Sequence, residues 1–245
     1  EIRQESLGVS LADVNAAQQT LPFVTEFSAE KKVKVFSLYS DFGKSEASAA
    51  GVSASYFALA NLTASAGRLL IEDDLVGVSQ VAVIGEDVAT ALFPNEEPIG
   101  QFIKLNHVWL TVVGVLNAPE LNKDNFQGVK LGGDRNRVFV PLSTILKKFR
   151  VGRLDSELDS FKLAIDPEVN PVVAAKAVTQ LLDLRHGESK DYKLVIPSEL
   201  LAQQKQTQQI FNIVMACVAG ISLLVGGIGI MNIMLANVLE RTKEI

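Results

Sequence analysis

The sequence is poor in the residues from which metal and redox sites are made. It has 245 residues with one cysteine, Cys217, and two histidines, His107 and His186. One cysteine cannot form an intrachain disulfide or a cysteine metal cage, and two imidazoles exclude a multi-histidine metal site. Basic residues are also in the minority, 23 against 28 acidic ones, which gives a net charge of −5. A nucleic-acid binder needs a strongly positive surface, so this class of partner is excluded.

Motifs for catalysis are equally scarce. The sequence has no G-x-x-x-x-G-K-[ST] phosphate loop, because the glycines between Gly128 and Arg135 lack the Lys-Ser/Thr pair. Ser143 and Lys147 are four residues apart, where a serine-lysine nucleophile motif needs three, and Ser28 with Lys31 has the spacing but no partner motif. We therefore expect no catalytic, cofactor-binding or metal-binding residues, and a non-catalytic subunit rather than an enzyme.

Three further features are interpreted as structural. Glu72, Asp73 and Asp74 have the carboxylates that hard cations prefer, but three successive acids are more typical of a solvated turn. His107 follows Asn106 in a predicted hairpin turn, so it is expected to be a turn residue rather than a ligand. The single tryptophan, Trp109, is expected to lie in the core.

The sequence does contain one long apolar run. From Gln206 to Leu239 no residue is charged, and about 20 apolar residues suffice to cross a bilayer. Its many Ile, Leu, Val and Phe residues each favour insertion by roughly 0.3 to 0.6 kcal/mol. We therefore expect a transmembrane helix, in preference to a buried helix of a large soluble protein. Since no proline follows Pro197, the helix is predicted to run unbroken to about Val238.

Small and amide side chains recur within this run. Pairs of small residues four apart let two helix backbones approach closely in a membrane, and an amide in hydrocarbon seeks a partner on another helix. The pattern favours a packed helix bundle over a lone anchor. The predicted packing residues are Ala216, Gly220, Ser222, Gly226, Gly227, Gly229 and Asn232.

The residues before the run predict a globular region. Ser10 begins a helix to about Gln19, with Asp13 at the capping-box position, and Asn170 with Pro171 begins a helix that Gly187 ends after Arg185. Two further helices are predicted over Glu86–Phe93 and from Ser143 to about Arg150. Alternation and apolar runs predict strands over Val33–Tyr39, Ala47–Val52, Gln80–Ile84, Ile103–Leu105, Val108–Leu116, Arg137–Val140, Ser160–Ile165 and Tyr192–Ile196. A polar loop is expected from Asn117 to Asn136.

These elements do not alternate regularly, which favours an α+β fold over a doubly wound sheet. Short strands are concentrated in the middle, so we expect a two-part domain with a β-rich insert. The predicted divisions are 1–50 and 151–197 for the first part, 51–150 for the insert, 198–209 for a helical stem, 210–239 for the transmembrane helix and 240–245 for a terminal charged segment.

Two sets of motifs resemble a known family. The segment Leu223–Ile245, with its VGGIGIMNIML core and ERTKEI run, resembles the second transmembrane helix of FtsX-like ABC-transporter permeases of the MacB type. The preceding region is similar to the MacB-like periplasmic core domain, because Gly67-Arg68, Pro98-Ile99-Gly100 and Val138–Pro141 occur in the family's order. Together the two resemblances cover nearly the whole chain.

The resemblance implies a place in the cell and a set of partners. It implies a four-helix permease of the inner membrane whose large domain lies in the periplasm, with 1–50 and 151–197 as a porter-like part and 51–150 as a sabre-like insert. The expected partners are an ABC ATPase subunit or domain that binds ATP and Mg, a second permease protomer, membrane lipid and a periplasmic adaptor or effector. The implied cytoplasmic coupling region is Glu240, Arg241, Thr242, Lys243 and Glu244.

Three functions are compatible with these features. The first is a permease subunit that transmits an ATP-driven conformational change to its periplasmic domain and so drives export or extraction of a substrate. The second is an FtsX-like regulatory relay that activates a periplasmic partner such as a cell-wall hydrolase without transport. The third, a membrane-anchored enzyme, is least favoured because no set of nucleophile, base and orienting residue is visible.

Overall fold

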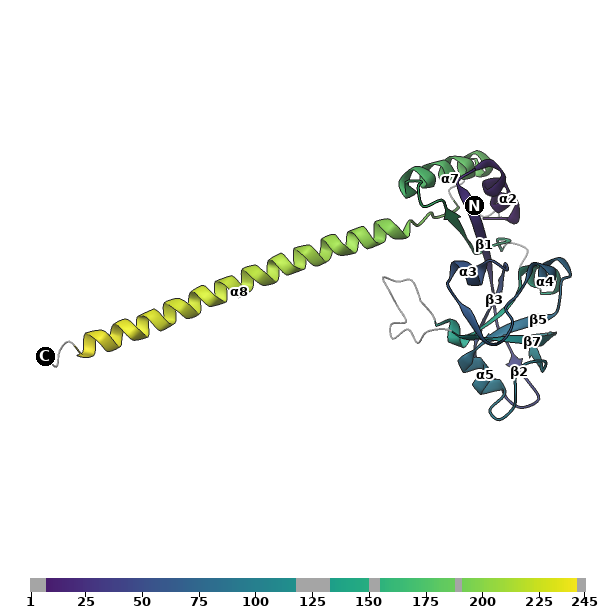
Figure 1. Ribbon diagram of the computed structural model, residues 1–245, viewed down its shortest axis with the longest axis horizontal. Helices are drawn as coiled ribbons and strands as arrows, with labels where there is room; N and C mark the ends of the chain where they lie inside the picture. Colours follow the sequence, from purple (N-terminus) through teal and green to yellow (C-terminus); the bar gives the residue numbers. More distant parts are fainter. Residues whose placement is uncertain (1–7, 118–132, 150–154, 188–190, 242–245) are drawn as a thin grey trace. The chain divides into compact units, whose positions relative to one another are not determined.

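The computed structural model describes residues 8–117, 133–149, 155–187 and 191–241, with the side chains of 197–206 and 238–241 left aside. The chain divides into two compact units, the residues up to Leu194 and those from Val195 onward. The first unit is an α+β domain built on a mixed sheet, and the second consists of one long helix (Figure 1). The α+β class and the long apolar helix predicted from the sequence are confirmed.

The first unit has nine strands among its described residues, joined in one sheet. The strands are β1 (Val24–Val33), β2 (Leu38–Tyr39), β3 (Ser48–Val52), β4 (Thr63–Gly67), β5 (Val81–Gly85), β6 (Phe102–Leu105), β7 (Val108–Asn117), β8 (Arg137–Pro141) and β9 (Ser160–Ile165). Their order is β2-β6-β7-β5-β8-β3-β1-β9, and β4 pairs with β7 outside this path. The pairs β3–β8 and β5–β7 are parallel, and the other pairs are antiparallel.

The helices lie between and beside these strands. They are α2 (Leu11–Thr20), α3 (Tyr56–Leu59), α4 (Glu72–Val76), α5 (Glu86–Leu92), α6 (Leu142–Lys148), α7 (Pro171–His186) and α8 (Pro197–Arg241), with a short 3₁₀ turn, η1 (Asp134–Asn136).

Strand β1 connects two parts of the sheet. Its first residues, Val24–Glu30, pair with β9, and its last ones, Glu30–Val33, pair with β3. Figure 1 shows β1 running from the α2 and α7 region toward β3, β5 and β7. One continuous strand therefore contributes to the packing of both parts.

Each part has a group of buried side chains of its own, and a further group, Val14, Ala29, Leu142 and Leu158, connects them. On the β9 side, Ala17 of α2 and Leu21, the residue after this helix, pack against α7. Their partners are Val178 and Leu182, together with Val24 of β1. On the β5 side, an aromatic cluster fills the space under α3, where the rings of Phe57 and Phe139 lie 5.5 Å apart. Aromatic pairs at this separation add to the free energy of burial.

The predicted helix ends are confirmed. Ser10 and Asp13 form a capping box at the start of α2. The amide oxygen of Asn170 accepts a hydrogen bond from the Val172 N–H at 2.9 Å, and Pro171 occupies the first turn of α7. Gly187 ends this helix with φ = +64°, a conformation that glycine adopts without a steric penalty. Local sequence signals were sufficient here because capping depends on neighbouring residues.

The predicted hairpin of β6 and β7 is also confirmed, with Asn106 at φ = +55° in its turn. The Asn106 side chain does more than tolerate the turn. Its oxygen accepts hydrogen bonds from the N–H groups of Phe36 and Ser37, and its nitrogen donates to the carbonyl of Lys34 at 2.9 Å. The hairpin turn therefore holds the segment that follows β1.

This contact explains why the strand predicted over Val33–Tyr39 is interrupted, with only its ends in strands, Val33 in β1 and Leu38–Tyr39 in β2. Strand β1 ends at Val33, and Lys34–Ser37 is irregular backbone whose hydrogen bonds are made with Asn106 instead of a neighbouring strand. The sequence analysis also missed most of β1, because its charged residues, including Glu30 and Lys31, hide the apolar pattern although both are buried.

Two other expectations are wrong for related reasons. Tyr192–Ile196 forms no strand, and the Tyr192 hydroxyl instead donates hydrogen bonds to the Thr179 carbonyl and the Asp183 carboxylate of α7. Trp109 is 46% exposed, because alternation along β7 buries Val108 and turns Trp109 to the outer face.

The acidic triplet is not a solvated turn. Glu72, Asp73 and Asp74 begin α4, and the Asp74 side chain is buried, where it accepts two hydrogen bonds from Arg68 at 2.6 and 3.0 Å and one from the Ile71 N–H. The Arg68 hydrogen bonds lower the pKa of Asp74, against the opposing effect of burial. Of the predicted loop Asn117–Asn136, residues 118–132 lie outside the described residues.

Candidate functional site

Helix α8 is the most unusual element of the chain. It runs for 45 residues, and Thr207–Asn237 within it form a 31-residue segment whose most apolar 18 residues have a mean hydropathy of 2.4 and are not buried. A rise of about 1.5 Å per residue gives this segment a length of about 46 Å, more than the roughly 30 Å hydrocarbon core of a bilayer. Length and composition therefore make it a candidate membrane span.

The seven predicted packing residues all lie on this segment and are all exposed. A side-chain carbon placed on any of its four glycines would meet no atom within 4 Å. The structure thus brings none of these residues against another part of the chain, and the prediction that they pack against other helices stays a prediction.

At about 100° per residue, the small residues fall on two sides of the helix. Ala216, Gly220 and Gly227 lie within about 40° of one another, and Ser222 with Gly226 and Gly229 form a second group within about 60°. The centres of the two groups are about 130° apart, and Asn232 belongs to neither. Helix geometry thus divides the predicted packing residues into two groups on different sides of α8. Two neighbouring helices would be needed to cover both groups.

The predicted coupling region lies at the end of α8. Glu240 and Arg241 are its last two residues. Thr242, Lys243 and Glu244 lie outside the described residues. The assignment of these five residues to a coupling region stays a prediction.

The domain residues just before α8 are held by a charged cluster that the sequence analysis did not find. His186, the last residue of α7, lies with Nε2 3.2 Å from Asp13 Oδ2 and with Nδ1 2.9 Å from Asp191 Oδ1. The Arg185 Nε donates to Asp13 at 2.6 Å, and the Gly8 N–H donates to Asp191 at 2.9 Å.

We call Asp13, Arg185, His186 and Asp191, with Gly8, the terminal cluster. Burial alone would raise the pKa of Asp13, but hydrogen bonds from Arg185 and Ser10 outweigh it and leave the pKa below its usual value. Asp13, His186 and Asp191 are nearly fully buried. The cluster joins the first described residues of the domain to those that precede α8, across more than 170 positions of sequence.

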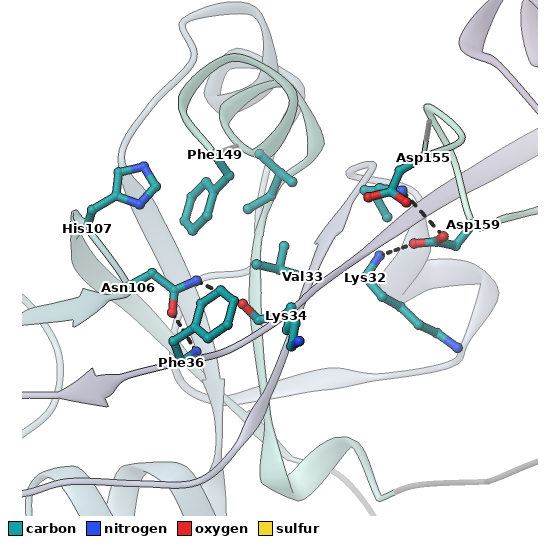
Figure 2. Close-up of a pocket in the computed structure, with 11 residues that line it drawn as sticks. Lys32, Val33, Lys34, Phe36, Asn106, His107, Phe149, Asp155 and Asp159 are labelled. Atoms are coloured by element: carbon teal, nitrogen blue, oxygen red, sulfur yellow. Dashed lines mark hydrogen bonds and ion pairs between the residues drawn. The ribbon is translucent and has the colours of Figure 1, made fainter. Parts of the chain in front are cut away.

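A second missed feature is a surface hollow of about 590 Å³ beside the end of β1 (Figure 2). Lysines 32 and 34 and the ring of Phe36 line it from one side, and His107 with Phe149 line it from another. His107 lies in the turn between β6 and β7, as predicted, and its Nε2 lies 2.9 Å from the Lys148 carbonyl. No sequence signal pointed to this hollow, because its lining comes from segments that meet only in the folded domain.

No metal centre accompanies these features. Among the described residues, no group of three or more His, Cys, Asp or Glu side chains is placed to hold a metal ion. The fold defines the class of protein: a mixed-sheet α+β domain followed by a candidate membrane span.

Comparison with known proteins identifies the family. The profile of the MacB-like periplasmic core domain matches residues 2–181. The chain belongs to this family, which confirms the resemblance drawn from its motifs.

Curated relatives and solved structures agree with this assignment. The macrolide export ATP-binding/permease protein MacB of Aggregatibacter actinomycetemcomitans is 37% identical over 195 residues, which are 80% of this chain and 29% of that protein. Its counterpart in Mannheimia succiniciproducens is 28% identical over 99% of this chain and 36% of its own length. The crystal structure of the periplasmic region of MacB from Actinobacillus actinomycetemcomitans superposes with a TM-score of 0.65 at 26% identity, over 81% of this chain and 83% of that one.

The coverages also show which part of the relatives this chain matches. The chain spans about a third of the length of the curated relatives. It corresponds to the periplasmic region of a MacB-type ABC-transporter permease with a candidate span after it. The nucleotide-binding activity in the relatives' names has no counterpart motif in these 245 residues.

Proposed function

We propose that this chain is the permease portion of a MacB-type ABC transporter, and that α8 carries ATP-driven motion across the inner membrane to the periplasmic domain. The motion would drive export or extraction of a substrate. The observation that carries this proposal is the continuity of α8, which runs as one helix from Pro197 to Arg241 through the candidate span.

The physical argument concerns stiffness. A helix moves as a rigid body along its axis because its backbone hydrogen bonds bind each turn to the next. A displacement at one membrane face therefore reaches the other face with little loss, whereas a flexible linker would absorb it. The charged residues Glu240 and Arg241 would lie on the cytoplasmic side, where an ABC ATPase subunit or domain with its ATP and Mg would act on them.

The terminal cluster supports a mechanical role for the domain as well. Motion arriving through α8 enters the domain at the segment after α7. There, His186 and Asp191 tie this segment to Asp13 of α2 and to Gly8. A pull on the segment would thus be shared with the first residues of the domain instead of peeling it away.

The domain divisions belong to the same proposal. Residues 1–50 with 151–197 would form the porter-like part, which fits the buried group shared by α2, β1, β9 and α7. Residues 51–150 would form the sabre-like insert, which contributes most of two other buried groups and shares them with Leu38, Ala47, Ala49 and Ala50 of the first part. Residues 198–209 would be the stem, 210–239 the membrane helix and 240–245 the start of the coupling region. A second permease protomer and membrane lipid would cover the exposed faces of α8.

The proposal is tested by two insertions of equal size in the stem, one that removes its stiffness and one that keeps it. Four glycines inserted after Gln206 cost roughly 1 kcal/mol of helix propensity each and introduce a swivel. Four alanines inserted at the same place keep the helix, rotate the domain by about 40° and lengthen the stem by about 6 Å. Output is measured as substrate resistance or release in cells, with membrane insertion, domain melting and ATPase activity as controls.

We expect the glycine insertion to abolish output and the alanine insertion to retain much of it, with all controls unchanged. Full output from the glycine variant would refute transmission through α8. Co-purification separates the transporter from the alternative relay: an export adaptor or channel is expected with the former, and a cell-wall hydrolase activated without substrate movement would instead establish the latter.

A further inference from the structure

A continuous surface around Phe36 combines basic and aromatic side chains. We call it the Phe36 face and define it by Lys32, Lys34, Phe36, Tyr39, Lys44, Lys104 and Trp109. Phe36 lines the hollow shown in Figure 2 and also a second hollow of about 690 Å³, which Tyr39 and Lys44 line on its other side. The ring of Phe36 thus contributes to both hollows.

The aromatic rings of this face are held open to solvent. Phe36 is 77% exposed and Trp109 is 46% exposed. The rings of Tyr39 and Trp109 meet edge to face with their centres 6.3 Å apart, across the paired strands β2, β6 and β7. The backbone beneath Phe36 is fixed by the Asn106 side chain, so the exposed ring sits on a supported segment.

Two of the four lysines of this face lie over its rings. The Lys104 ammonium lies 5.7 Å from the centre of the Tyr39 ring and 5.4 Å from that of Trp109, and the Lys34 ammonium lies 5.3 Å from that of Phe36. Cation–π contacts of this kind position an ammonium without neutralising its charge.

No acidic side chain among the described residues forms a salt bridge with Lys32, Lys34, Lys44 or Lys104. The acids that line the same hollows cancel these charges only in part. Asp159 pairs with Lys31 and accepts a hydrogen bond from the Lys32 backbone N–H. With Lys104, the two hollows have five lysines against three acids, Asp155, Asp159 and Glu46. A chain of net charge −5 therefore presents a local excess of positive charge.

This combination fits a particular occupant. Exposed aromatic rings are typical of the centre of a protein–protein interface. The lysines around these rings favour carboxylates on the partner, because complementary charge guides association and fixes register. Two hollows that share the Phe36 ring suit a segment that crosses Phe36 in extended form and places a side chain in each.

We propose that the Phe36 face docks an acidic, extended segment of a partner protein. This inference rests on the proposed function in one respect, since a domain that is moved by α8 needs a protein on which to act. It adds the place of contact and the chemistry of the partner segment.

The test is site-specific photocrosslinking in the full-length protein, in the membranes of its own cells. A benzophenone amino acid replaces Phe36, and the control position is Val76 on α4, which is 82% exposed. We expect an adduct from position 36 and none of the same mass from position 76. Sequencing of the adduct should place the crosslink in a segment with at least two Asp or Glu residues within five positions.

Charge reversal supplies the specificity. Lys34→Glu with Lys104→Glu should lower the yield of this adduct about tenfold. Lys176→Glu, on the exposed side of α7, is the matched control and should leave it unchanged. Replacing the acids of the crosslinked segment by lysine should restore the yield with the reversed variant. If the first variant melts below the parent protein, it is replaced by Lys32→Glu with Lys44→Glu, which changes two lysines of the same face whose ammonium groups do not lie over its rings.

The proposal is overturned by any of four results: no adduct from position 36, an adduct with lipid or lipopolysaccharide, an adduct with a second copy of this chain, or a crosslinked segment without acids. Crosslinking is carried out without ATP turnover, so its outcome is separate from that of the stem insertions. If the glycine insertion in the stem keeps full output and the acidic adduct still forms, transmission through α8 is refuted and the docking face is retained.

Discussion

The domain and helix α8 differ in how they satisfy their apolar residues. In the domain, side chains such as Phe57, Phe139 and Ile84 are almost completely buried by other parts of the same chain. In α8 every described side chain from Thr207 to Asn237 is exposed, including Leu223 at 80%. A soluble fold completes its own core, whereas α8 requires lipid or other helices. The difference shows that the domain buries its apolar side chains within the chain, whereas the apolar side chains of α8 are not covered by the chain itself.

The strongest test of this difference is to separate the two units. We expect residues 8–196 to be soluble without detergent and to unfold in one cooperative transition, because their core is closed within the unit. The same residues with α8 attached should need detergent or membrane. Thermal melting followed by near-UV circular dichroism, with dye binding as a second probe, checks this. Broad melting with dye binding would mean that the domain core is completed by another element.

Truncation of a core ring should have the next largest effect. Phe139→Ala removes a fully buried ring from the cluster with Tyr56 and Phe57, and we expect a loss of about 3 to 5 kcal/mol in the free energy of unfolding. Leu223→Ala removes an exposed side chain of α8 and should change it by less than about 0.5 kcal/mol. Urea titrations of both variants in the same detergent make the measurement, and equal losses would contradict the comparison.

A smaller effect, confined to assembly, is expected from α8. Gly227→Leu adds bulk to the group of small residues with Ala216 and Gly220, so it should weaken association with other permease helices by about 1 to 2 kcal/mol, or roughly tenfold. Ile228→Leu, at the next position, is the matched control. Association is measured by energy transfer between labelled protomers in membranes. Wild-type assembly of the glycine variant would show that these glycines face lipid.

The smallest effect concerns acid pH and is confined to the domain. The pKa values of Asp13 and Asp74 are lowered in the folded state by hydrogen bonds from Arg185 and Arg68, despite opposing burial. Fewer protons are therefore bound in the folded than in the unfolded state. The stabilisation is complete above the ordinary value near pH 3.8 and is lost as the pH falls through the lower folded values.

The measurement is the urea midpoint between about pH 6 and pH 2.5. The variant Asp74→Asn should be less stable than the parent at pH 6, and the gap should narrow as the pH falls below about 4. A gap that stays constant to pH 2.5 would show that the Arg68 pair does not depend on the charge of Asp74.

Sequence reasoning succeeded where a feature depends on residues that are close in the chain. The capping residues Ser10 and Asn170, the turn at Asn106, and the apolar length of α8 could be read directly, and the family followed from contiguous motifs. It failed where a partner distant in sequence replaced the expected one. The strand predicted over Val33–Tyr39 is interrupted at Lys34–Ser37 because Asn106, about 70 positions away, supplies hydrogen bonds to that segment.

The amino-acid sequence by itself determined that this protein has an α+β domain followed by a long apolar helix, since hydrophobic periodicity and helix capping act over a few residues. Tertiary structure alone decided which polar groups lie together. It brought His186 between Asp13 and Asp191, buried Asp74 against Arg68, and left Phe36 and Trp109 exposed beside unpaired lysines. The physical reason is that burial and charge pairing depend on distances in space, which strand order and register set.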